Sequence, residues 1–231
     1  MTFYAFRTWA AITLLACLTL TGCAHVQPPV PLDHQFWDAK EPTIGVAITV
    51  LPAPVLALTG NQGLIDYAIN RGVNSKLSDN VEHWQTRDLN TLPDVIVAKL
   101  QAKGYKAKRI DEPLDLQKFK ENSFREGYTA RDLTPIKTTH GVDRLLLVNV
   151  FATGATRSYY SVVPTSAPMA QVTGQGMVVD LADNKLLWFQ PFATVQAAQG
   201  EWDEPNYANL SNAFYQAMDT SRQQMITPFA Q

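Results

Sequence analysis

The chain has 231 residues, of which 46% are hydrophobic and 17% are charged, and this balance predicts a folded protein rather than a disordered one. We expect one globular domain, because a single core stops growing only near roughly 250–300 residues. The formal net charge of −2 and the pI near 6.1 argue against a basic surface for phosphates, so no nucleic-acid partner is predicted.

The first 22 residues are typical of a secretory signal peptide. They carry one basic residue, Arg7, and no acid, and residues 9–20 form an apolar run too short for a bilayer, which needs about 20 residues. The run ends in LTGC, which resembles the bacterial lipobox and implies cleavage before a lipidated Cys23. The alternative interpretation is an uncleaved N-terminal helix with a chance cysteine.

Lipidation of Cys23 has consequences for chemistry and location. The other cysteine, Cys17, leaves with the signal peptide, so the mature domain has no thiol for a disulfide, a nucleophile or zinc. Two or three acyl chains hold a protein stably at a membrane. Ala24 stands where the lipobox sorting rule has aspartate for inner-membrane retention, so the resemblance implies an outer-membrane lipoprotein on the periplasmic side.

Residues 23–42 contain four prolines and little apolar periodicity, and we predict an extended tether there. A single periplasmic domain then covers residues 43–231. His25 and His34 lack the spacing of a metal site, and we predict neither a metal nor a cofactor.

The first half of the domain contains an apolar strand and several helices. Residues 44–51 predict a buried strand closed by prolines, and one or two short helices are expected over 63–83. The clearest helix has Thr91 as its N-cap and ends at Gly104. A strand over 105–110, a polar stretch and a short helix ended by Gly141 complete this half.

The second half is β-rich and closes with a helix. Residues 142–151 predict a strand buried on both faces. Three further β segments are expected over 159–163, 169–181 and 186–193, the last two joined in a hairpin by Asp183 and Asn184. A final helix with one apolar stripe follows. The predicted fold class is α/β, an α+β sandwich whose mixed sheet has a C-terminal antiparallel meander packed by helices.

Three stretches carry a family resemblance: LQAKGYKAKRI, HGVDRLLLVNVFATG and GMVVDLADNKLLWF. Together they are similar to bacterial envelope lipoproteins whose compact α/β domain is related to the periplasmic domain of the curli-secretion lipoprotein and to lipoproteins that activate peptidoglycan synthases. The match covers roughly residues 43–229 and rests on pattern and order. The resemblance implies a mostly non-enzymatic protein that forms pores, scaffolds assemblies or docks onto envelope partners.

No motif predicts catalysis. The sequence contains no nucleophile elbow, no zinc-protease helix motif and no phosphate loop. His83 beside Glu82, and His140 near Asp132, become acid–base pairs only through a tertiary arrangement, and we interpret them as surface or helix-end residues. The Gly174-Gln175-Gly176 sequence lies inside a β segment, so it indicates a bulge or close packing under a helix rather than a dinucleotide site.

Two surfaces are candidate binding sites. The apolar residues Val55, Leu56, Ala57 and Leu58 form either a folded-over core segment or an exposed interaction patch. An aromatic group on the meander and its exit forms either core or a face that stacks a sugar or peptide; its members are Tyr159, Tyr160, Trp188 and Trp202.

These observations favour a non-enzymatic outer-membrane lipoprotein that contributes to an envelope assembly through protein contacts, with an envelope protein or a homo-oligomer as partner. The first alternative is a periplasmic binding module for a cell-wall fragment or small ligand. The second is an envelope hydrolase with an unrecognised site.

Overall fold

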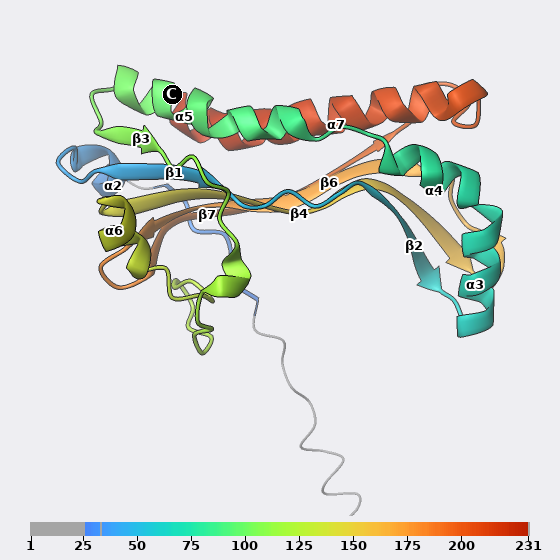
Figure 1. Cartoon of the computed structure of the whole chain (residues 1–231), viewed down its shortest axis with the longest axis horizontal. Helices are drawn as coiled ribbons and strands as arrows, with labels where there is room; N and C mark the ends of the chain where they lie inside the picture. The colour runs from blue at the N-terminus through green and yellow to red at the C-terminus, as the bar shows by residue number, and fades with distance from the viewer. Residues whose placement is uncertain (1–25, 33, 231) are drawn as a thin grey trace, which may run out of the picture.

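The structure is a computed structural model that describes residues 26–32 and 34–230. The predicted signal peptide and Cys23 lie outside these residues. One mixed sheet of seven strands runs the length of the molecule, with helices packed against it (Figure 1). The predicted α/β class is confirmed.

The sheet has the order β3-β1-β4-β6-β7, and β2 and β5 pair with the far end of β4. The strands are β1 (Ile44–Ile48), β2 (Val55–Asn61), β3 (Ala107–Arg109), β4 (Arg144–Tyr160), β5 (Val163–Pro164), β6 (Met169–Asp180) and β7 (Lys185–Ala197). The helices are α2 (His34–Asp38), α3 (Leu64–Val73), α4 (Ser75–Glu82), α5 (Leu92–Ala102), α6 (Pro135–His140) and α7 (Ala208–Ile226). Short 3₁₀ turns occupy Arg87–Thr91, Leu116–Lys118, Pro205–Tyr207 and Thr227–Phe229.

Strand β4 is the axis of the fold. Its first half pairs in parallel with β1, its second half pairs in parallel with β2, and β6 runs antiparallel to both halves. The strand predicted over residues 142–151 is therefore confirmed but continues to Tyr160. A register shift at Phe151 bends the strand, as β-bulges do, and the two halves of the sheet diverge there.

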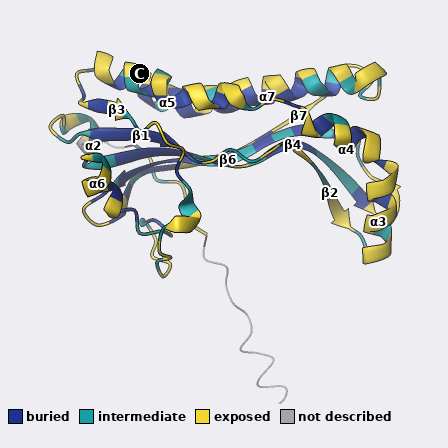
Figure 2. Ribbon diagram, in the orientation of Figure 1, coloured by how far each residue is buried: buried dark blue, intermediate teal, exposed yellow. Residues whose placement is uncertain are grey.

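The sheet buries a core on each face. Helices α5 and α7 cover one face, where alternate β4 residues such as Leu146 and Val148 belong to one core cluster with Phe214 of α7. The opposite face is covered at one end only, by α6 and the preceding segment, which pack Ile110 and Leu133 against Leu147. Figure 2 shows buried residues on the strands and on the inner sides of these helices. The remainder of that second face lies open below the bend.

The N-terminal segment belongs to the domain, so the prediction of a tether reaching to Pro42 is wrong. Val30 forms a bridge with Phe189 of β7, and Phe36 of α2 is fully buried against Tyr105. The apolar side chains of residues 30–37 stabilise the fold by burial. Only residues 24–29 remain between Cys23 and the first strand contact, a reach of about 20 Å when fully extended.

Helix α5 confirms the clearest helix prediction, including its start after Thr91, although the Thr91 side chain does not cap it. Thr91 occupies the N-cap position, but its hydroxyl donates to the carbonyl of Asp88 and caps no N–H of α5. The 3₁₀ turn before α5 places the Asp88 carbonyl within hydrogen-bond distance of the Thr91 hydroxyl. The helix stops before Gly104, whose φ of +84° is the left-handed conformation that glycine adopts at low cost.

The glycines of β6 are confirmed as sites of close packing. A Cβ on Gly176 would lie 2.4 Å from the Trp188 ring and 2.7 Å from the sulfur of Met225 on α7. A Cβ on Gly174 would lie 2.5 Å from the Asn149 carbonyl oxygen. Only glycine allows the neighbouring groups to approach this closely.

Candidate functional site

Helix α3 carries the largest group of exposed apolar side chains among the described helices. Leu64 is 93% exposed, Ile65 77% and Val73 75%, and Tyr67 and Ile69 are about half exposed, at 45% and 48%. The only buried residue of the helix is the polar Asn70. We call the five exposed residues the α3 patch. Figure 2 shows α3 exposed at one end of the molecule, below the end of α7 and next to α4.

Local interactions explain why these residues form a helix without apolar burial. The Asp66 carboxylate accepts a hydrogen bond from the N–H of Gly63 at 3.2 Å, which caps the first turn. Arg71 lies in the last turn, where a cation interacts favourably with the helix dipole. After the helix ends at Asn74, α4 turns back to the core and buries Leu77 and Val81. The α3 helix is thus anchored at its C-terminal end.

A polar network holds α3 and α4 to the sheet. Asn74 is 97% buried, and its Nδ2 donates to the hydroxyl of Tyr159 on β4 at 2.7 Å and to the Asn70 carbonyl at 2.6 Å. The Oδ1 of Asn74 accepts from the Arg157 guanidinium at 2.8 Å. The same guanidinium lies over the ring of Trp202, 4.9 Å from its centroid. One asparagine therefore connects the helix pair to β4 through two side chains, Tyr159 and Arg157.

Asn70, one turn before Asn74, joins α3 to the β4–β5 turn. Its Nδ2 donates to the carbonyl of Ser161 and to Oε1 of Gln62, both at 2.8 Å. The turn exposes Tyr160 and Val163 by 66% and 60%. The polar side of α3 faces inward and its apolar side faces solvent, the reverse of an ordinary surface helix. Such exposed apolar patches mark interaction sites.

The predicted patch on Val55, Leu56, Ala57 and Leu58 lies on β2, beside α3. Val55 is half exposed, whereas Leu56 packs against the main core. The pairing of β2 with β4 had no sequence signal, because these two parallel strands lie far apart in the chain. The α3 patch did have a sequence signal. Residues 64–73 carry apolar side chains around most of the helix, which is more than one core-facing stripe requires.

The predicted aromatic face does not form. Tyr159 is 96% buried and is held by Asn74, and Trp188 is 97% buried against Phe229. Tyr160 points to the exposed turn, and Trp202 stacks on Tyr207. Consecutive strand residues alternate between the two faces, so Tyr159 and Tyr160 do not share one surface.

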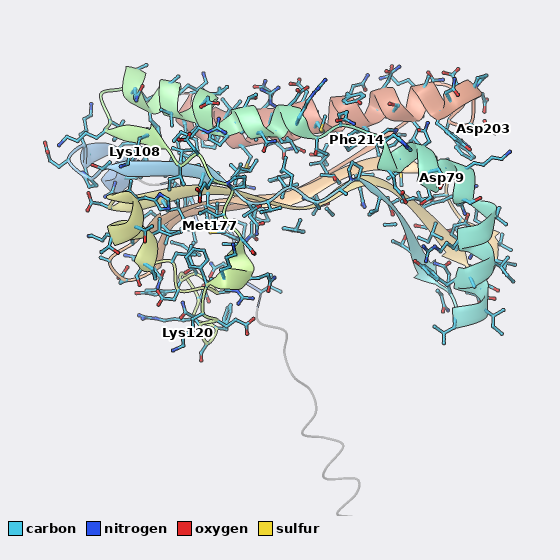
Figure 3. All side chains as sticks on the ribbon, viewed as in Figure 1. Asp79, Lys108, Lys120, Met177, Asp203 and Phe214 are labelled. Carbon is cyan, nitrogen blue, oxygen red and sulfur yellow. The ribbon has the colours of Figure 1, made fainter. Side chains whose placement is uncertain are left out.

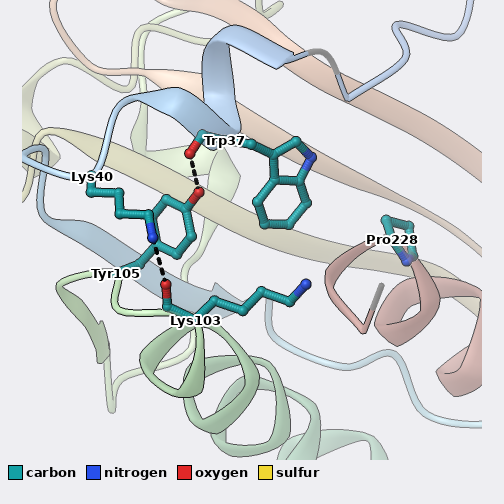
Figure 4. Close-up of a pocket in the computed structure, with 5 residues that line it drawn as sticks. All are labelled: Trp37, Lys40, Lys103, Tyr105 and Pro228. Carbon is teal, nitrogen blue, oxygen red and sulfur yellow. Dashed lines mark hydrogen bonds between the residues drawn. The ribbon is translucent and has the colours of Figure 1, made fainter.

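A shallow hollow of about 460 Å³ lies where α2 meets the end of α5 (Figure 4). Its polar groups are engaged in attaching the N-terminal segment. The Tyr105 hydroxyl donates to the Trp37 carbonyl, and Lys40 donates to the Lys103 carbonyl at 3.0 Å. Burial raises the pKa of Tyr105 above its usual value, which keeps this donor protonated. We interpret the hollow as part of the contact that holds the N-terminal segment to the end of α5.

The histidine and carboxylate residues are dispersed. The imidazole Nδ1 of His83 contacts the carbonyl of Asp79 on its own helix, and Asp132 is bound by Thr134 and Asn184. The Asn184 hydrogen bond is the main reason that the pKa of Asp132 lies below its usual value. Within residues 26–32 and 34–230, no three His, Cys, Asp or Glu side chains form a group suited to a metal ion.

Over the same described part of the chain, none of the helices combines the length and the apolarity that crossing a membrane requires.

No family model matches the sequence, and no curated protein matches it. Several solved structures are similar in part. Protein XCC0632 of Xanthomonas campestris, of family DUF330, is 14% identical with a TM-score of 0.35, over 80% of this chain and 90% of that one. Lipoprotein GNA1162 of Neisseria meningitidis is 13% identical with a TM-score of 0.28, over 78% and 99%. The PelC dodecamer of Paraburkholderia phytofirmans is 8% identical with a TM-score of 0.29, over 89% and 95%. At these identities and scores the likenesses establish neither a family nor an activity for this chain.

Proposed function

We propose that this chain is a non-enzymatic lipoprotein, anchored through Cys23 on the periplasmic side of the outer membrane, that contributes to a cell-envelope assembly by docking through the α3 patch. The observation that carries the proposal is the reversed polarity of α3: five large apolar side chains face solvent while Asn70 is buried. Burying an apolar side chain in an interface contributes about 1.5–3 kcal/mol. The partner is another envelope protein or a second copy of the chain.

The short connection to Cys23 supports this arrangement. Because Val30 already bridges β7, the domain lies within about 20 Å of its anchor residue. A docking surface held at this distance meets partners in or on the same membrane. The polar network of Asn70, Asn74 and Arg157 keeps α3 in place before any partner binds, which lowers the entropic cost of docking.

The docking proposal predicts that replacing both Leu64 and Ile65 by serine abolishes the crosslinked species formed by the protein in cells. These two side chains are the most exposed of the patch, so their loss removes interface area without removing core. Crosslinking in intact cells, followed by mass measurement of the purified species, checks this. A matched control is Tyr215→Ser on α7, which removes an exposed aromatic side chain from another helix. Crosslinks unchanged by the double substitution would contradict the proposal.

The anchor predicts a separate result. The Cys23→Ser chain has no acceptor for the acyl chains, so we expect it in the soluble periplasmic fraction, whereas the parent chain fractionates with outer membranes. Mass spectrometry of the parent should find acyl chains on residue 23. A Cys23→Ser protein that still fractionates with membranes would count against the lipid anchor.

A further inference from the structure

A second cavity lies below the covered end of the sheet, away from the α3 patch. Its volume is about 420 Å³, within the usual range for small-ligand sites. The floor is the sheet and the roof is the segment of residues 116–131, which precedes α6. In Figure 3, Met177 lies on the sheet side of this region and Lys120 lies on the roof segment.

The floor combines apolar side chains with two carboxamides. Asn149 and Gln175 are register partners on β4 and β6, beside Leu147 and Met177. Thr49 donates its hydroxyl to Oδ1 of Asn149 at 3.1 Å, which leaves Nδ2 of that amide available to a ligand. The Gln175 side chain has no hydrogen-bond partner among the described residues. A ligand that covers these carboxamides must offer them a polar partner, because an unsatisfied amide is costly to desolvate.

The mouth of the cavity carries a free cation. The guanidinium of Arg125 stacks on Tyr128, 3.7 Å from the ring centroid, and it has no ion pair among the described residues. Arg131, in contrast, is bound to Glu121 at 2.7 Å. Among the described residues that line the cavity there is no Asp or Glu. The site therefore has a net positive rim and favours an anionic ligand.

The roof is fixed near its C-terminal end. The N–H of Thr129 donates to the Asn184 carbonyl at 3.0 Å, and the N–H of Leu186 donates to the Gly127 carbonyl at 2.8 Å. Oε1 of Gln27 accepts from the N–H of Gly127, so the N-terminal segment also holds the roof. A cavity held in this way exists before a ligand binds, which reduces the ordering cost of binding.

We infer that this cavity binds a short peptide with a free carboxylate and small apolar side chains. The Asn149 and Gln175 amides, which offer both donors and acceptors, pair with the peptide group. Leu147, Met177 and Phe189 receive the side chains. Arg125 binds the carboxylate, for which its planar guanidinium is well matched. A purely hydrocarbon ligand would leave the two amides unpaired.

Calorimetric titration of the purified lipidated chain in mild detergent with N-acetyl-alanyl-alanine tests the inference. We expect a dissociation constant below about 1 mM. The C-terminally amidated probe should bind at least about tenfold more weakly, because it lacks the charge that Arg125 recognises. The Arg125→Gln variant should bind both probes with the same low affinity, and Gln175→Leu should weaken both in parallel.

Lys120→Gln is the matched control, since Lys120 lies on the same roof segment and does not line the cavity. It should bind the acid probe like the parent chain. Arg125 is exposed, so its substitution does not threaten folding; circular dichroism verifies the fold of Gln175→Leu. The inference is overturned if the parent shows no binding at millimolar probe, if acid and amide bind equally, or if Arg125→Gln binds like the parent. Crosslinking through the α3 patch is a separate readout and does not depend on this result.

Discussion

Replacing Gly154 by alanine should detach β2 from the sheet and destabilise the protein by about 3 kcal/mol or more. Gly154 has a φ of +120°, a conformation that L side chains rarely adopt, and it pairs with Val55 of β2. A Cβ there would lie 2.2 Å from the Val55 carbonyl oxygen, so the β2 backbone must move. Because β2 leads directly into α3, the α3 patch loses its position as well. Urea unfolding measures the loss of stability, and in-cell crosslinking tests whether the proposed docking is lost with it.

Gly72→Ala is the matched control for this substitution. Gly72 lies inside α3, a Cβ on it would meet nothing within 4 Å, and its φ lies outside the left-handed region. Alanine there should leave the stability unchanged or raise it by up to about 1 kcal/mol, because glycine is a poor helix former. Equal unfolding free energies for the two alanine variants would show that the β2–β4 contact is not constrained as the structure indicates.

Replacing Asn74 by alanine should cost about 3 kcal/mol of stability, concentrated in α3 and α4. The substitution removes an acceptor from the half-buried Arg157 guanidinium and a donor from the buried Tyr159 hydroxyl. A buried polar group left without a partner lowers the free energy of unfolding by more than the lost hydrogen bond had contributed. Hydrogen exchange should show that α3 opens in the variant while the core strands stay protected.

Tyr159→Phe and a double-mutant cycle separate the contributions. Tyr159→Phe removes one hydrogen bond and keeps the ring, so we expect a loss of only about 1 kcal/mol. If Arg157 and Asn74 act together, the Arg157→Ala and Asn74→Ala double variant is less destabilised than the sum of the single variants. Additive losses would mean that the two side chains stabilise the helix pair independently.

Much of the secondary structure was accessible from local patterns. The apolar run of β1, the helix of α5, the turn at Gly141 before β4 and the β6–β7 hairpin are all in the predicted places. Each of these elements is specified by side chains within a few residues of one another. The predicted meander is confirmed because β4, β6 and β7 are neighbours in the chain as well as in the sheet.

The candidate sites depended on contacts between distant segments, and the predictions for them were less accurate. Trp188 and Tyr159 have the aromatic character of a binding face, but α7 covers the first and Asn74 holds the second. The cavity floor at Asn149 and Gln175 had no sequence signal, because strand register brings these amides together from two different strands.

The sequence by itself determined the class of fold, the order of its main elements and the expectation of a lipid anchor at Cys23. Hydrophobic periodicity, capping residues and the LTGC motif are local, and they act over one or two turns of chain. Only the tertiary structure decided which apolar residues are exposed. The polar contacts of Asn70 and Asn74 turn α3 outward, and the contact of Val30 with Phe189 leaves only residues 24–29 between Cys23 and the sheet. Burial is a property of the whole chain, because it depends on what every other segment covers.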